Sequence, residues 1–212
     1  MSGVRSTETP DSILERIGDA STVLLLAPSL DSRKDDACLD LLTVTDPPQE
    51  NVLSITFTQS ATDRLRLWDE HIEERPAQTG IISVGEMMRS TTADTSTTVQ
   101  QSVGPLVIET VSDPSDLTEL GMTISSLLTE WNTNNNETVA CFHSITSLIQ
   151  YADVQRVFHF LHVLTGKFDS SEVVAHYHMD PSAHDQQTIS TLMPLFDVIV
   201  ERDENDQWTV RQ

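Results

Sequence analysis

The sequence predicts a single three-layer α/β domain, with a mostly parallel sheet, helices on both faces and an antiparallel hairpin at one edge. Apolar runs of strand length alternate with amphipathic segments of helix length along the whole chain. Several of these runs, such as "TVLLLA", are continuously apolar, as expected for strands that are covered on both faces. The length of 212 residues suits one sizeable domain better than two.

The elements follow from these patterns in chain order. Residues 1–10 are polar and are expected to form a flexible arm, which leaves 11–212 for the domain. The expected strands cover residues 22–27, 51–57, 79–85, 104–111, 138–143 and 172–179, and the terminal hairpin covers 196–203 and 207–212. The expected helices cover residues 11–18, 35–42, 61–75, 113–131 and 183–195, together with one that begins near 153 and stops at Gly166. The Thr- and Ser-rich segment 86–103 is expected to be a loop.

The composition is strongly acidic and poor in lysine. The formal net charge is −21, the pI is about 4.4, and the only lysines are Lys34 and Lys167. Such a charge disfavours nucleic acid and anionic lipid as partners, because both require cationic patches. An acidic, lysine-poor surface is typical of a protein that stays hydrated in concentrated salt, where charge repulsion is screened. We therefore expect a halophilic protein.

Targeting and cysteine usage give a consistent expectation. No apolar run is long enough to span a bilayer, and the first residues lack the order of a signal peptide. Cys38 and Cys141 each lie in an apolar segment, so we expect two buried free thiols in place of a disulfide. These features predict a cytoplasmic protein without membrane insertion.

The turn after the first strand lies where α/β proteins often hold a phosphate. A P-loop needs G-x-x-x-x-G-K-[ST], but here Ala27 and Ser32 take the glycine positions, Arg33 takes that of the lysine and Lys34 that of the hydroxyl residue. The wrapping geometry and the metal ligand are therefore lost. One interpretation is a plain connection with Asp residues capping the helix. The alternative is an atypical nucleotide site that uses Arg33, Lys34 and Asp31.

The second half of the chain carries a family resemblance. "TVACFHSITSLIQYADVQRVFHFLHVLTGKF" and "VVAHYHMDPSAHDQQTISTLMPLFDVIVE" resemble the back half of the RecA/KaiC-like ATPase core, in particular the short haloarchaeal KaiC-related proteins. In active members the strand matching "TVACFH" ends in an Asp that orients magnesium, followed by Ser. Here the Ser remains as Ser144, but His143 takes the Asp position, and "SITF" offers no water-activating Glu. The resemblance thus implies a RecA-like fold with degenerate nucleotide machinery.

The histidines form a second group of candidates. Six of the seven lie between His143 and His184, and His176 and His178 alternate on one expected strand, so their side chains point the same way. With Asp180 they could supply three ligands for a metal-dependent hydrolase. The alternative is a strand-to-helix loop in which Asp180 or Ser182 caps the next helix, and we favour this reading without a bound metal.

The function expected from these observations is that of a non-catalytic pseudo-ATPase, with no cofactor. It would act as a regulatory or scaffolding module in signal transduction, through a protein partner or self-association. The alternative is a nucleotide-binding signal-transduction ATPase with an atypical phosphate loop. Segment 86–103 and the loop "HYHMDPSAHD" are the first candidates for mutation, because function concentrates in loops.

Overall fold

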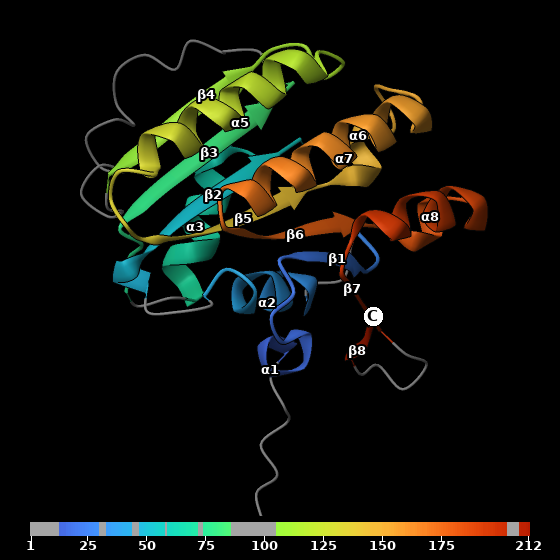
Figure 1. Cartoon of the computed structure of the whole chain (residues 1–212), viewed down its shortest axis with the longest axis horizontal. Coiled ribbons are helices and arrows are strands. Elements are labelled where there is room, and N and C mark those ends of the chain that lie inside the picture. The colour runs from blue at the N-terminus through green and yellow to red at the C-terminus, as the bar shows by residue number, and fades with distance from the viewer. Residues whose placement is uncertain are drawn as a thin grey trace, which may run out of the picture.

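The computed structural model of the chain describes residues 13–29, 33–43, 47–57, 59–71, 74–85, 105–202 and 208–212 (Figure 1). The expected arm, Asp31, Ser32 and segment 86–103 lie outside these residues, as does the side chain of Arg33. Within them, eight strands form one sheet in the order β4-β3-β2-β5-β6-β1-β7-β8. No helix of the described part of the chain is long and apolar enough to cross a membrane.

The sheet is parallel except at its last edge. Neighbouring strands from β4 to β7 run in the same direction, and β8 pairs antiparallel with β7, as the sequence predicts. The strands are β1 (Thr22–Leu26), β2 (Glu50–Thr56), β3 (Gln78–Val84), β4 (Leu106–Val111), β5 (Glu137–His143), β6 (Val173–Met179), β7 (Val198–Arg202) and β8 (Trp208–Arg211). The expected single α/β domain is therefore confirmed.

Helices cover both faces of the sheet (Figure 1). The main helices are α1 (Ile13–Ile17), α2 (Arg33–Asp40), α3 (Ala61–His71), α5 (Leu117–Trp131), α6 (Ile145–Leu148), α7 (Val154–Ser170) and α8 (Gln186–Leu192). Alternation along β1 separates the two layers: Leu24 and Leu26 pack into the core under α5, α7 and α8, whereas Val23 and Leu25 pack against α1 and α2. The first of these is the larger core, and it contains Phe142, Tyr177 and Trp131.

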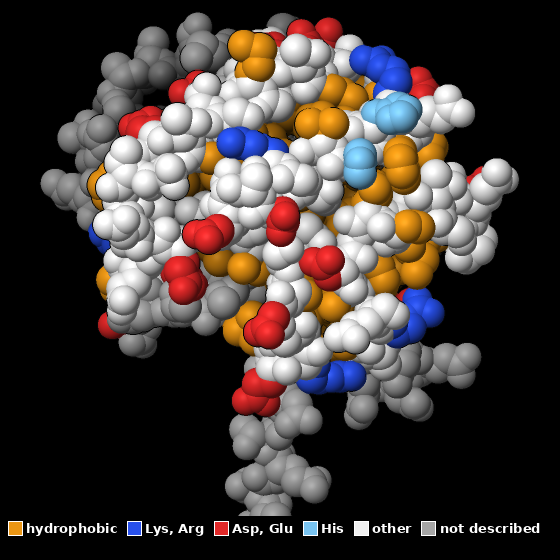
Figure 2. Space-filling model, viewed as in Figure 1, with side chains coloured by type: hydrophobic (Ala, Val, Ile, Leu, Met, Phe, Trp, Pro, Cys, Tyr) orange, Lys and Arg blue, Asp and Glu red, His pale blue; other side chains and the backbone are white. Residues whose placement is uncertain are grey.

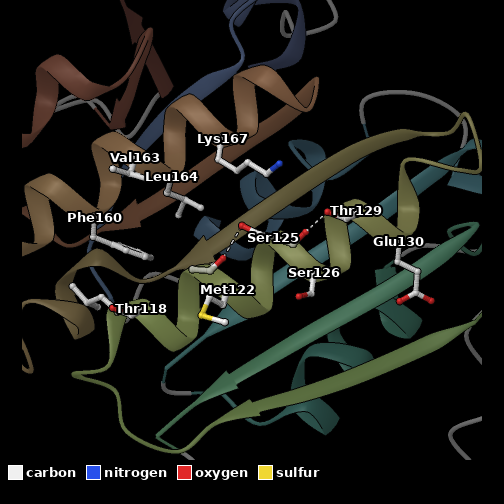
Figure 3. Close-up of a pocket in the computed structure, with 12 residues that line it drawn as sticks. Thr118, Met122, Ser125, Ser126, Thr129, Glu130, Phe160, Val163, Leu164 and Lys167 are labelled. Carbon is white, nitrogen blue, oxygen red and sulfur yellow. Dashed lines mark hydrogen bonds between the residues drawn. The ribbon is translucent and has the colours of Figure 1, made fainter.

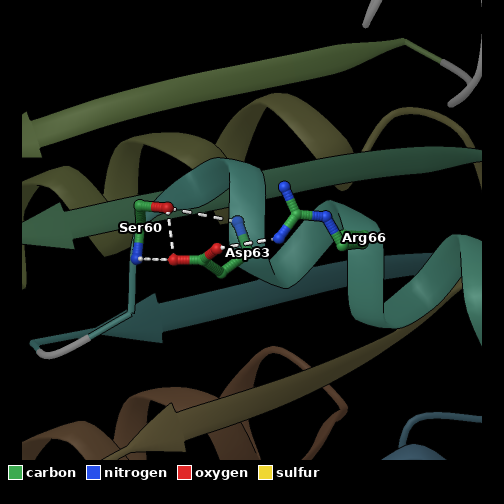
Figure 4. A network of polar contacts seen from close by, with 3 residues as sticks. All are labelled: Ser60, Asp63 and Arg66. Carbon is green, nitrogen blue, oxygen red and sulfur yellow. Dashed lines mark hydrogen bonds and ion pairs between the residues drawn. The ribbon is translucent and has the colours of Figure 1, made fainter.

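Helix α3 begins at a reciprocal cap (Figure 4). The Asp63 backbone N–H donates to Ser60 Oγ at 3.1 Å, and the Ser60 hydroxyl donates to Asp63 Oδ2 at 2.7 Å. This arrangement satisfies donors that the first helical turn leaves without an intrahelical partner. Arg66 adds an exposed ion pair to Asp63 at 3.4 Å. The cap fixes where α3 starts. It thereby also fixes the position of Arg64, the residue after Asp63.

Two expectations about helix ends were wrong. Helix α7 does not stop at Gly166 but continues to Ser170. The chain leaves the helix at Ser171 and takes a positive φ of 54° at Glu172. Asp180 does not cap α8 either. It caps the short turn Pro181–Ala183, and Asp185 caps α8 by accepting a hydrogen bond from the Thr188 backbone N–H at 2.7 Å.

Candidate functional site

The loop after β1 is tied to the loop after β6. The Ser29 backbone N–H donates a hydrogen bond of 2.7 Å to Asp180 Oδ2, and the buried Lys34 ammonium at the start of α2 donates to the Ser29 carbonyl. Ala27, at the first glycine position of the P-loop pattern, is buried and donates its N–H to the Met179 carbonyl at 3.1 Å. The loop's described polar groups are thus used within the chain.

Asp180 is the acceptor at the centre of this arrangement. Besides Ser29, the Ser182 backbone N–H and hydroxyl donate to Asp180 Oδ1, at 2.9 and 2.6 Å. Partial burial alone would raise the pKa of the carboxyl, but the hydrogen bonds from Ser182 and Ser29 outweigh it and lower the pKa to about 2. A fixed negative charge therefore lies against the N–H of the first strand-to-helix turn.

His143 ends the central strand β5 and Ser144 follows it directly, as expected. Burial, with smaller contributions from His178 and Arg64, lowers the pKa of His143 to about 2, so the imidazole is neutral. Ser144 caps α6, since its Oγ accepts a hydrogen bond from the Ser147 backbone N–H at 3.2 Å. On β2, Ser54 to Thr56 carry no carboxylate. The strand end at which the sequence resemblance leads one to expect a magnesium-orienting Asp therefore offers a neutral nitrogen base.

A second polar cluster lies under α2, on the sheet face that α2 and α3 cover. Cys141 on β5 and His176 on β6 are register partners, and His178 follows two residues later on the same face. Cys38 reaches them from α2: its Sγ lies 3.5 Å from Cys141 Sγ and 3.2 Å from His176 Nε2. All four side chains are buried, and apolar side chains, among them Leu42, Val52, Val139 and Trp68, pack with the two cysteines.

A buried cation adjoins this cluster. Arg64 Nη2 lies 3.7 Å from Cys38 Sγ and 3.5 Å from Ser54 Oγ. The hydrogen bond from Cys141 and the Arg64 guanidinium hold the pKa of the Cys38 thiol well below its ordinary value, against the opposing effect of burial. Arg64 thus places positive charge beside the Cys38 thiol and favours its deprotonation.

The structure brings together only part of the expected metal trio. His176 and His178 lie side by side, with ring centroids 5.2 Å apart, as their alternation predicts. Asp180 is not in the group, since its carboxylate is bonded to the Ser29 backbone N–H in the loop after β1. The sequence analysis missed the pairing of Cys38 with Cys141. The usable signal was a cysteine and a histidine pair on two apolar strands that a parallel sheet places side by side.

A groove lies on the surface between α5 and α7 (Figure 3). Its volume is about 810 Å³, and Met122 and Val163 stand beside it with 67% and 70% of their surfaces exposed. Figure 2 shows this side of the molecule, on which hydrophobic side chains lie between polar ones and Lys and Arg are sparse. Glu130 and Lys167 line one part of the groove.

Comparison with known proteins gives one family and a fold. A family model described as "Family of unknown function (DUF7504)" matches residues 20–202. The chain belongs to this family. No curated protein matches the sequence.

Two solved structures resemble this chain in fold. A protein from Pyrococcus horikoshii OT3, the subject of a structural study, is 12% identical with a TM-score of 0.58, over 91% of this chain and 86% of that chain. A prototypical ATPase from the type III secretion system of pathogenic bacteria is 11% identical with a TM-score of 0.51. That match covers 87% of this chain and only 51% of the ATPase chain. The expected RecA-like fold is confirmed, and at these identities the likeness concerns the fold alone.

Proposed function

We propose that this chain is a RecA-like module that does not hydrolyse ATP and that acts through a protein partner, in a regulatory or scaffolding role. The observation that carries the first part is the hydrogen bond from the Ser29 N–H to the Asp180 carboxylate. In a phosphate-binding turn, backbone N–H groups point at the ligand and the local field attracts an anion. Here the described N–H already has an anionic partner, supplied by the chain itself.

The electrostatics oppose a triphosphate at this position. A phosphate approaching Ser29 would meet the Asp180 carboxylate, and like charges at contact distance repel. The position at which a magnesium ligand is expected is also changed. Magnesium prefers hard oxygen ligands, whereas His143 offers a neutral imidazole. Both departures lead to the same proposal of a domain without ATPase activity.

Calorimetry and phosphate release test this proposal. The wild-type chain, in molar KCl with magnesium and millimolar ATP, is expected to give neither binding heat nor phosphate release. Asp180→Ala removes the internal anion, and Gln187→Ala, at an exposed position on α8, is the matched control. Micromolar ATP affinity in the wild type that disappears in Arg33→Ala/Lys34→Ala would overturn the proposal in favour of an atypical signal-transduction ATPase.

The groove between α5 and α7 supports the second part of the proposal. Two hydroxyls that line it are bonded within α5: Ser125 Oγ donates to the Gly121 carbonyl at 2.8 Å, and Thr129 Oγ1 donates to the Ser125 carbonyl at 2.7 Å. The groove also presents two exposed apolar side chains, Met122 and Val163. Such a surface suits the apolar face of an amphipathic helix from another protein.

Substitution at the groove tests the partner. Met122→Glu and Val163→Glu place charge beside the groove, whereas Gln155→Glu changes an exposed residue of α7 that does not line it. The partner is first isolated from high-salt lysate and purified. It is expected to bind the wild type and Gln155→Glu equally well. Its affinity for the groove variants is expected to be lower by at least about tenfold, or 1.4 kcal/mol. Equal binding to all variants would contradict the proposal. Self-association that the groove variants abolish would identify a second copy as the occupant.

The cellular setting is a further part of the proposal. We propose a halophilic, haloarchaeal cytoplasm, supported by the net charge of −21 and the presence of only two lysines. Repulsion among the carboxylates is screened to about 3 Å at 1 M salt, so concentrated KCl stabilises such a surface. The denaturation midpoint in urea is expected to rise as KCl increases from 0.1 M toward saturation, and a midpoint that is flat or falls would contradict the proposed setting.

A further inference from the structure

The buried cluster under α2 has the composition and spacing of a metal site. One ligand atom from each of Cys38, Cys141, His176 and His178 lies within 4.8 Å of the other three. Zn–S bonds of about 2.3 Å and Zn–N bonds of about 2.0–2.1 Å place tetrahedral ligand atoms about 3.3–3.8 Å apart. The separations of 3.5 Å between the two sulfurs and 3.2 Å from Cys38 Sγ to His176 Nε2 are close to those values.

We propose that Cys38, Cys141, His176 and His178 bind one Zn²⁺ per chain in a closed structural site. Two sulfurs and two imidazole nitrogens in a tetrahedral arrangement suit zinc, and magnesium or calcium would require oxygen ligands. Four protein ligands leave no open position for water, so the site holds structure and performs no hydrolysis. It thus differs from the three-ligand hydrolase site expected from His176, His178 and Asp180.

The burial of the four groups supports a bound cation. The exposed fractions are 0% for both cysteines, 1% for His176 and 4% for His178. His178 Nε2 has no hydrogen-bond partner among the described residues, and burying a polar atom in this state costs free energy. The four buried groups otherwise bond only weakly among themselves, as in the contacts of Cys38 Sγ with Cys141 and His176. A zinc ion provides a common partner for all four.

The charges around the site are also consistent with zinc. Binding releases the two thiol protons to solvent, and the two thiolates cancel the charge of Zn²⁺. Arg64 Nη2, 3.7 Å from Cys38 Sγ, is placed to donate to that thiolate from outside the coordination sphere, as outer-shell groups of zinc sites do. The buried guanidinium therefore faces a sulfur that carries negative charge.

The site would fasten segments that are far apart in the sequence. Cys38 belongs to α2, and the other three ligands belong to β5 and β6 near the centre of the sheet. Without the metal, α2 is held on this face by apolar contacts of residues such as Leu39 and Leu42. Zinc would add a bond between this short helix and the two strands that precede the Ser144 and Asp180 loops.

Metal analysis of the full chain tests the site directly. Protein expressed with added zinc, purified under reducing conditions and dialysed against a weak chelator is expected to retain about one zinc per chain. Replacing zinc by Co²⁺ is expected to give the intense visible absorption of tetrahedral thiolate coordination. Two free thiols with no stoichiometric zinc, or a Cys38–Cys141 disulfide found by mass spectrometry without reductant, would overturn the proposal.

Variants assign the ligands. Cys38→Ser and His176→Gln are expected to weaken zinc binding, measured against a chromophoric chelator, by more than the roughly 10–100-fold that loss of an outer-shell group costs. Two control variants change polar residues outside the ligand set: Ser54→Ala next to the cluster and His184→Gln away from it. Both are expected to retain the zinc affinity of the wild type. If a ligand variant fails to fold, the zinc content and Co²⁺ spectrum of the wild type still decide, and zinc held equally by all variants contradicts the assignment.

Discussion

The Ser29 backbone N–H donates its hydrogen to an Asp180 carboxylate oxygen 2.7 Å away, across 151 positions of sequence. This bond joins the loops after β1 and β6, which are adjacent strands of the sheet. Ser182 shares the same carboxylate. Asp180 therefore holds together the two loops at the carboxyl ends of β1 and β6, where open α/β sheets commonly bind a ligand.

Removing this carboxylate should destabilise the domain. Asp180→Ala leaves the Ser29 and Ser182 N–H groups without their acceptor, and loss of a capping side chain costs about 0.5–2 kcal/mol. We expect a lower guanidinium midpoint with an unchanged slope, and Gln187→Ala, exposed on α8, should stay close to wild type. An unchanged midpoint in Asp180→Ala would show that solvent replaces the carboxylate without cost.

Acid should weaken the fold through depressed carboxyl pKa values. The pKa of Asp180 is about 2, against an ordinary value of 3.8. Partial burial raises the pKa of Asp197, but hydrogen bonds from Thr22 and Ser21 at the start of β1 outweigh it and leave the pKa below its ordinary value. Because both folded values are depressed, their stabilisation is full above the unfolded pKa and is lost as the pH falls from about 4 toward 2.

The test compares unfolding of the wild type, Asp180→Asn and Asp197→Asn at several pH values between 5 and 2 in concentrated KCl. Each variant lacks one titrating group, so its free energy of unfolding should fall less steeply than that of the wild type over this range. Parallel curves for wild type and variants would show that other carboxylates account for the acid sensitivity.

Tyr177 should be replaceable by phenylalanine with a gain in stability. Its ring is fully buried between Phe142, Phe168 and Phe196, and its hydroxyl has no hydrogen-bond partner among the described residues. Removing an unsatisfied buried hydroxyl while keeping the ring should raise the free energy of unfolding by about 1 kcal/mol. Phe142→Ala, which opens a cavity in the same core, should lower it by about 3–5 kcal/mol. Thermal unfolding of both variants measures the contrast, and destabilisation by Tyr177→Phe would indicate a buried water on the hydroxyl.

Two glycines should respond to alanine in opposite directions. A Cβ at Gly80 on β3 would lie 2.8 Å from Cη2 of the buried Trp131, so Gly80→Ala should cost about 1–3 kcal/mol by overpacking. A Cβ at Gly166 would meet nothing within 4 Å, and alanine there should stabilise α7 by about 1 kcal/mol through helix propensity.

Chemical denaturation of the two alanine variants checks these signs. The double variant Gly80→Ala/Trp131→Phe should recover part of the lost stability, since the smaller ring makes room for the methyl group. A Gly80→Ala variant as stable as wild type would mean that the Trp131 indole shifts freely, contrary to its tight packing.

The strands could be predicted from the sequence because burial on both faces gives unbroken apolar runs. The burial of every residue of β1 agrees with this, whereas β2 is buried throughout although Glu50, Asn51, Ser54 and Thr56 are polar. The predicted strand boundaries differ from the observed ones by at most two residues. The end of α7 could not be read from Gly166, because packing of Leu164 and Phe168 under the sheet outweighs the weak helix propensity of one glycine.

The candidate sites were predictable to different degrees. The departures at Ala27 and His143 could be seen by comparison with a motif, and the fold places both residues at the expected strand ends. The Cys38–Cys141 contact spans 103 positions and depends on β5 and β6 being neighbours and on α2 covering that face. Local patterns carry no such long-range information. The bond from Ser29 to Asp180 was hidden for the same reason.

The strand order also constrains how the chain can be made. Strand β1 is made before the other strands of the described sheet, yet its only pairing partners in that sheet are β6 and β7, which lie within residues 173–202. Until residues 173–202 have been synthesised, the largely apolar segment "TVLLL" has neither neighbour and is exposed to association with other nascent chains. A chain interrupted before residue 173 would carry that unpaired segment permanently, so aggregation during translation is the hazard that this topology builds in.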